Sequence, residues 1–128
     1  MLRKTIFTIL MCCTTSWALA ITAAQIESDV SILSKQTPSR VDEYTTLRSV
    51  LFVNTLFYKG VVYTMQTDAD EASLKNIEPK LKAHIKSSMC SGSWTRDVLG
   101  SGYAIDHLYQ DRSGKAVVMN RLVAKDCK

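Results

Sequence analysis

The chain has 128 residues, of which 46% are hydrophobic and 22% are charged, and its formal net charge is +4. This length fits one small domain with a marginal core and excludes a multidomain enzyme. The charge is too weak to indicate a nucleic-acid partner, and no apolar run beyond the N-terminal region is long enough to cross a membrane.

Residues 1–20 have the pattern of a secretory signal peptide. Two basic residues precede an apolar run over residues 6–13, and small residues surround the expected cleavage site after Ala20. We therefore expect the mature chain to begin at Ile21 and to form a single domain over residues 21–128. The signal peptide predicts export of this domain, with release from the cell left open.

The cysteines support export. Cleavage after Ala20 leaves Cys90 and Cys127 as the two cysteines of the mature chain, and an even pair in an exported chain predicts a disulfide. This bond would close a loop of about 38 residues and stabilise the fold by roughly 4 kcal/mol. Lipidation of Cys13 is the less favoured outcome, because no small residue precedes it as in lipoprotein signals.

The first half of the domain predicts a helix followed by a hairpin. Apolar residues at helical spacing predict a helix over residues 22–35. Residues rich in Val, Thr, Tyr and Phe then predict strands over 47–53 and 56–65 with a turn at 54–55. Gly60, inside the second strand, indicates a bulge or a close approach of another chain segment.

A longer helix is predicted to follow, ending at Cys90. Asp68 and Glu71 have the spacing of a helix cap with its reciprocal acid. Pro79 should kink the helix or restart it. The apolar stripe expected to be buried comprises Leu74, Ile77, Leu81 and Ile85.

The last third predicts a short helix over 93–99 and a second hairpin with strands over 103–109 and 115–123. The turn over residues 111–114 ends in Gly114, which suits a positive φ. The element order predicts an α+β fold, with a single antiparallel sheet of two hairpins, helices packed on one face and one disulfide.

The sequence does not predict an enzyme, a metal site or a cofactor. No thiol remains in the mature chain once the disulfide forms, and the sequence has no zinc, calcium or phosphate-loop spacing. Asp106 and His107 are adjacent in a predicted strand, so their side chains should point to opposite faces and cannot act as a pair. We expect Asp106 to be solvated, His107 to be packed or at a rim, and His84 to be a boundary residue.

Four residues are candidate partner contacts. Lys75, Lys82 and Lys86 form a basic ridge on the long helix, which is either a solvated face or a docking surface for an acidic partner or phospholipid head groups. Trp94 is expected to pack over the disulfide, with an exposed interface contact as the alternative.

An ordered series of short segments in the C-terminal half resembles two groups of small envelope proteins; these segments are 89–90, 95–99, 102–105, 111–115 and 126–127. One group is the beta-type pilotins of type II secretion systems, and the other is a group of quorum-sensing-regulated virulence factors from Gram-negative bacteria. The pilotin resemblance implies the Cys90–Cys127 bond and a groove or sheet face that binds a short C-terminal segment of an outer-membrane secretin. Those pilotins are lipoproteins.

The leading functional hypothesis is a non-enzymatic periplasmic accessory protein that recognises another envelope protein, such as a secretion-system component. The alternative is a periplasmic inhibitor or immunity protein directed against a toxin or hydrolase. A small hydrolase using His107 or His84 is a third and weaker hypothesis.

Overall fold

The computed structural model describes residues 20–128, so the predicted signal peptide, apart from its last residue, lies outside the described residues. The elements follow in the order α1 (Ala23–Lys35), β1 (Ser39–Arg40), β2 (Thr45–Asn54), β3 (Lys59–Thr67), α2 (Glu71–Cys90), α3 (Ser93–Gly100), β4 (Ala104–Gln110), β5 (Ala116–Leu122) and the 3-10 helix η1 (Ala124–Cys127).

The strands form one five-stranded sheet in the order β1-β2-β3-β4-β5. Both predicted hairpins are present, as the antiparallel pairs β2–β3 and β4–β5. The prediction of a wholly antiparallel sheet is wrong, because β3 and β4 are parallel. Parallel neighbours need a long crossover, and here α2 and α3 return the chain to the end of the sheet at which β3 begins.

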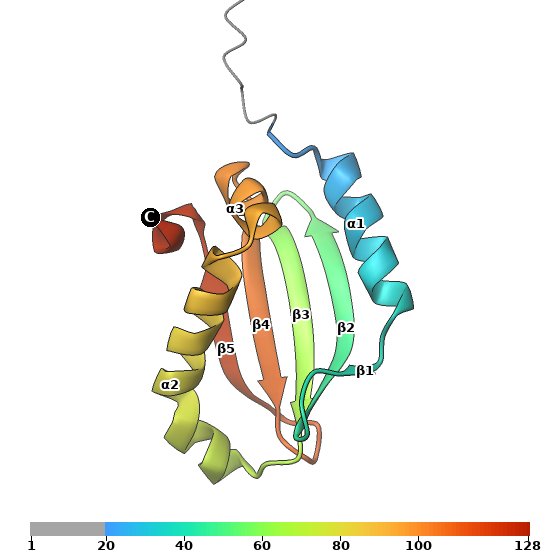
Figure 1. Cartoon of the computed structure of the whole chain (residues 1–128). Helices are drawn as coiled ribbons and strands as arrows, with labels where there is room; N and C mark the ends of the chain where they lie inside the picture. Colours follow the sequence, from blue (N-terminus) through green and yellow to red (C-terminus); the bar gives the residue numbers. More distant parts are fainter. Residues whose placement is uncertain (1–19) are drawn as a thin grey trace, which may run out of the picture.

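Both long helices lie over the same face of the sheet, α1 against β2 and α2 against β5 (Figure 1). Strand side chains alternate between faces, so every second residue of the inner strands points toward the helices. The core lies between the two layers and includes Ile26, Val30, Val50, Val61, Leu74, Ile85, Ile105 and Val118. Among residues 20–128, no helix lies on the opposite face of the sheet, which we call the open face (Figure 1).

Helix α2 begins later than predicted. Its N-cap is Asp70, whose carboxylate accepts a hydrogen bond from Ser73 N at 2.7 Å. Asp68 lies two residues before the cap, where its N–H donates to the Tyr44 carbonyl at 3.0 Å and keeps this part of the chain beside the sheet. The helix runs past Pro79 without a restart, since buried Leu74 and Ile85 hold the segments on both sides of the proline.

Two glycines have the roles predicted for them. Gly114 has φ +87° in the β4–β5 turn, a value that residues with a side chain rarely adopt. Gly60 marks a close approach, since a Cβ at this position would lie 2.5 Å from the Ala104 carbonyl oxygen of the neighbouring strand.

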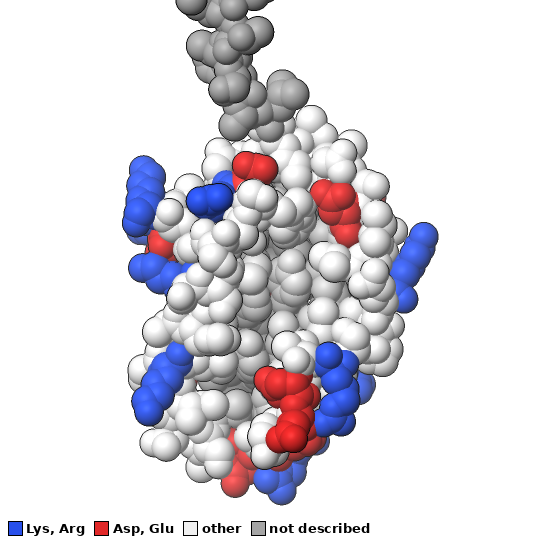
Figure 2. Space-filling model, viewed as in Figure 1, with Lys and Arg blue, Asp and Glu red and all other residues white. Residues whose placement is uncertain are grey.

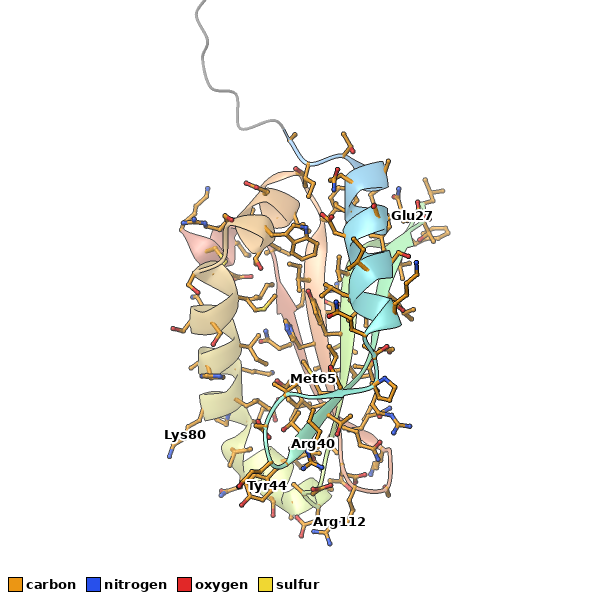
Figure 3. The ribbon with its side chains drawn as sticks, turned by 45° about the vertical axis from the view of Figure 1, so that its right-hand side comes forward. Glu27, Arg40, Tyr44, Met65, Lys80 and Arg112 are labelled. Carbon is orange, nitrogen blue, oxygen red and sulfur yellow. A yellow bond between two sulfur atoms is a disulfide. The ribbon has the colours of Figure 1, made fainter. Side chains whose placement is uncertain are left out.

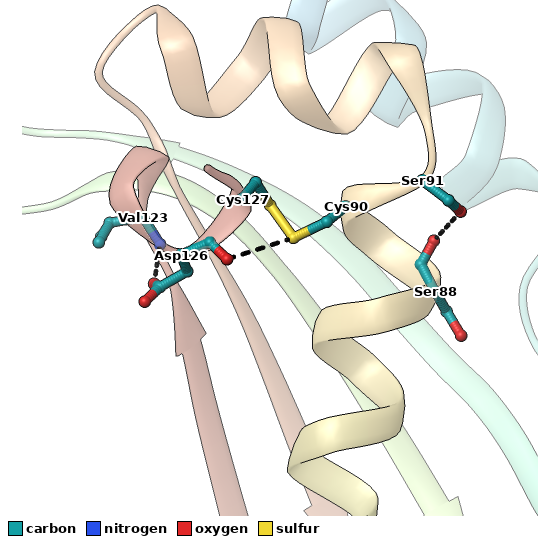
Figure 4. The surroundings of a disulfide bond; sticks show 6 residues. All are labelled: Ser88, Cys90, Ser91, Val123, Asp126 and Cys127. Carbon is teal, nitrogen blue, oxygen red and sulfur yellow. Dashed lines mark hydrogen bonds between the residues drawn. A yellow bond between two sulfur atoms is a disulfide. The ribbon is translucent and has the colours of Figure 1, made fainter.

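The predicted disulfide is present at the end of α2 (Figure 4). Cys90 and Cys127 have bonded sulfur atoms 1.98 Å apart and Cα atoms 5.2 Å apart. Cys90 Sγ also lies 3.7 Å from the Asp126 carbonyl oxygen, which is a contact only, because a disulfide sulfur has no proton to donate. The bond ties the C-terminal turn of α2 to η1.

Candidate binding groove

A hollow runs between α1 and α2 on the helix-covered face (Figure 2). No Lys, Arg, Asp or Glu is coloured within it, whereas charged residues surround it. Met65 of β3 lies between the two helices in Figure 3 and forms part of the floor. Tyr63 points to the same side of the strand as Met65, since the two residues are two positions apart. We call this hollow the interhelical groove.

One wall of the groove is a flank of α2. The helical repeat places Leu74 and Ile85 toward the sheet, and Ile77 and His84 on the flank nearer α1. The prediction that Ile77 is buried is wrong, because its side chain is 43% exposed. The groove separates α2 from α1 at this level, so no other element covers Ile77.

The opposite wall belongs to α1, which is fastened to α3. The indole N–H of Trp94 in α3 donates to the Asp29 carboxylate in α1 at 2.8 Å. The half-buried Trp94 therefore joins two helices at one end of the groove. Its packing over the disulfide stays a prediction. Asp29 was missed by sequence reasoning, because no local pattern links it to a tryptophan 65 positions later.

A row of polar side chains crosses the floor. Tyr63, His107 and Asn120 are paired neighbours on β3, β4 and β5 and point to the helix side. The rings of Tyr63 and His107 stack with centroids 4.9 Å apart and planes 5° from parallel. His107 is a packed residue, as predicted, with 4% of its surface exposed.

Burial changes the acidity of both rings. It raises the pKa of Tyr63 to about 12. It lowers the pKa of His107 to about 4, against a smaller opposing effect of the Asp106 charge. Both rings are therefore neutral at neutral pH.

The polar row is incompletely satisfied. Within residues 20–128, His107 Nδ1 and Asn120 Nδ2 are buried and have no hydrogen-bond partner. Each such group costs about 1–3 kcal/mol relative to a satisfied one. Apolar residues at these positions would avoid this cost. The floor of the groove therefore differs from an ordinary apolar core in holding buried polar side chains.

The predicted lysine ridge lies on the other flank of α2, away from the groove. Lys75 pairs with Glu71 at 2.8 Å and Lys82 pairs with Glu78 at 3.0 Å, and Glu71 also bonds Lys115 beside β5. Lys86 is exposed on the same flank. The structure therefore does not bring the ridge and Trp94 together into one surface.

The open face of the sheet carries a second polar cluster. Asp106 accepts hydrogen bonds from Tyr58 Oη at 2.9 Å and from Arg121 Nε and Nη2 at 3.0 Å each. The expectation that Asp106 is solvated is wrong, since only 6% of its surface is exposed. It points away from His107, as strand alternation predicts, so the two do not form a catalytic pair.

In the described part of the chain, no group of three or more His, Cys, Asp or Glu residues could hold a metal ion. None of the helices over the same residues is long and apolar enough to span a membrane.

The fold is shared with solved structures of a secreted protein and of two secretion-system pilotins. A Pseudomonas aeruginosa protein described as secreted is 14% identical, covers 82% of this chain and 95% of its own, and has a TM-score of 0.67. The pilotin EpsS of the Vibrio vulnificus type 2 secretion system is 15% identical over 82% and 90% of the two chains, with a TM-score of 0.63.

The type II secretion system pilotin AspS of Vibrio cholerae is 18% identical over 79% of this chain and 87% of its own, with a TM-score of 0.60. No protein-family model and no curated protein sequence matches the chain. The predicted resemblance to pilotins is therefore confirmed as a likeness of fold.

Proposed function

We propose that this protein is a non-enzymatic accessory protein of the periplasm that binds an amphipathic segment of an envelope protein in the interhelical groove. The proposed partner is the C-terminal segment of a secretin. The observation that carries the proposal is an uncharged groove, open to solvent, on a fold shared with two type II pilotins.

The surface of the groove suits an apolar ligand face. Ile77 is exposed on one wall, and at the lower end Tyr44 and Val41 are 68% and 56% exposed (Figure 3 labels Tyr44). Exposed apolar side chains gathered around a hollow favour a site for a protein segment. An amphipathic helix laid into such a groove would bury its apolar face and leave its polar face in water.

The groove is also held in shape. The Trp94–Asp29 hydrogen bond fixes α3 to α1, and the disulfide fixes the end of α2 to η1. A preformed site loses less conformational entropy on binding than one that must first assemble. These two links therefore support binding without a large rearrangement of the walls.

The test is the affinity for a labelled synthetic peptide that carries the C-terminal segment of the secretin from the same organism, followed by fluorescence anisotropy. We expect Ile77→Asp to raise the Kd by at least about tenfold, because a charge on the wall must be desolvated against an apolar ligand face. The matched control is Leu51→Asp, which puts the same charge at a 53% exposed position on the open face.

Equal affinity of wild type and Ile77→Asp would contradict the proposal, as would an equal loss in Leu51→Asp. Circular dichroism of both variants separates loss of binding from loss of fold.

A further inference from the structure

The loop between β2 and β3 holds two apolar side chains out in solvent. Leu56 is 89% exposed and Phe57 is 96% exposed, more than any other large hydrophobic residue described. Neither belongs to the interhelical groove, which is bounded by α1, α2 and β3. We call Leu56 and Phe57 the apolar tip.

The tip is part of a closed turn. Thr55 N donates to the Tyr58 carbonyl at 2.8 Å, and Tyr58 N donates to the Thr55 hydroxyl at 3.0 Å. These reciprocal bonds join the residues on both sides of the tip, so Leu56 and Phe57 occupy the two central positions of a defined turn. A turn of this kind displays its central side chains.

The base of the turn is anchored to the sheet. Tyr58 Oη donates to Asp106, and the Arg121 guanidinium lies 5.3 Å from the centre of the Tyr58 ring. Arg121 in turn bonds both carboxylate oxygens of Asp106. Tyr58 is therefore fixed by a hydrogen bond and a cation–π contact, which prevents the tip from folding back onto the protein.

Positive charge lies beside the tip. Phe57, Lys59 and Arg121 line a shallow depression of about 390 Å³. The Asp106 carboxylate offsets one of the two cations, which leaves an excess of positive charge beside the apolar side chains. Apolar side chains with neighbouring cations are the combination that binds the interface of an anionic bilayer.

We infer that the apolar tip docks this protein peripherally on an anionic lipid surface. The tip is convex, so a rigid partner would need a matching pocket to bury it. A bilayer interface is deformable and can bury the two side chains without such a pocket. The loop also lies at the same end of the molecule as the start of α1 (Figure 1).

The test uses the exported protein purified from the periplasm, with vesicles of phosphatidylethanolamine and phosphatidylglycerol, in a sedimentation assay. The double variant Leu56→Ser, Phe57→Ser should lower the vesicle partition coefficient by at least about tenfold, because both inserted side chains are lost. The matched control, Leu51→Ser with Met119→Ser, removes two exposed apolar residues from the open face and should leave the partition coefficient unchanged.

A second readout does not depend on the loss of binding. When vesicles are added, the fluorescence emission of the Phe57→Trp variant should shift to shorter wavelength, relative to the wild type, whose expected mature chain 21–128 has Trp94 alone. Unshifted emission together with no co-sedimentation overturns the inference, as does an equal loss in the control. A tip variant that loses affinity for the secretin peptide but keeps vesicle binding also overturns it, and shows a protein contact; the groove variant Ile77→Asp should retain vesicle binding.

Discussion

The two faces of the sheet differ in how completely their buried polar side chains are hydrogen-bonded. On the open face, Asp106 accepts three hydrogen bonds from Tyr58 and Arg121. On the groove face, the next residue, His107, is buried against Tyr63 with an unpartnered Nδ1. The difference shows that the more solvent-accessible face has the better satisfied polar cluster, and that unsatisfied polar atoms gather under the groove.

The two clusters of polar side chains therefore have different roles, one in holding the fold together and the other near the proposed binding site. The Asp106 cluster fixes the β2–β3 loop to β4 and β5, which is a structural task that full satisfaction of the carboxylate serves. The groove row contributes no such link, and the walls above it are held by contacts elsewhere. The proposed site therefore lies over the two buried side-chain atoms of residues 20–128 that have no hydrogen-bond partner, His107 Nδ1 and Asn120 Nδ2.

Loss of the disulfide should have the largest effect on the stability of the groove face relative to the open face. Cys90→Ser frees the end of α2, which forms one wall of the groove, and should lower the free energy of unfolding by about 2–5 kcal/mol. Urea denaturation measures the loss. Hydrogen exchange should show faster opening of α2 than of β2, so the groove face loosens first. An unchanged midpoint, or equal loosening of both elements, would show that the bond does not support the wall.

Acid should weaken the groove face through His107. The pKa of His107 is about 4 in the folded protein and 6.5 without burial. Between these values the unfolded chain binds a proton that the folded chain does not. The contribution of neutral His107 to the free energy of unfolding is therefore fully present above pH 6.5 and is lost as the pH falls toward 4. The total loss should be about 3 kcal/mol.

The control for acid weakening is His107→Phe, which keeps a ring beside Tyr63 but cannot be protonated. Chemical denaturation at several pH values should show that this variant lacks the part of the pH dependence assigned to His107. Every other ionisable group is common to both proteins, so the difference between the two curves isolates His107. Identical slopes for wild type and variant would refute this account of the buried ring.

The open face should respond to loss of charge without a change at the groove. Asp106→Asn removes the ion pair with Arg121 and weakens the bond from Tyr58, at a cost of about 2 kcal/mol measured by thermal or urea unfolding. Affinity for the secretin peptide should stay the same, because Asp106 points away from the groove. A fall in affinity as large as that of Ile77→Asp would mean that the two faces are coupled.

The sequence predicted the local elements well because their signals are local. The turn at Gly114, the helical spacing around Ile26 and the small number of cysteines each depend on neighbours or on counting. The parallel pairing of β3 with β4 was missed, because turn residues define each hairpin but not how two hairpins join.

The groove could not be predicted from the sequence, because it is the space left between two helices that contact different strands of one sheet, α1 on β2 and α2 on β5. Ile77 has the spacing of a buried residue and becomes a wall residue only because α1 lies too far away to cover it. Asp106 looked solvated because its partners, Tyr58 and Arg121, come from a loop and a strand that only folding brings together.

The central claim is that the interhelical groove, and not the open face, receives the envelope partner. Photo-crosslinking in the periplasm tests it most directly, with benzoylphenylalanine placed at position 77 in one strain and at position 51 in another. We predict a crosslink to the secretin from position 77 and none from position 51. Crosslinking from position 51 alone, or none from position 77 while the protein still co-purifies with the secretin, would contradict the claim.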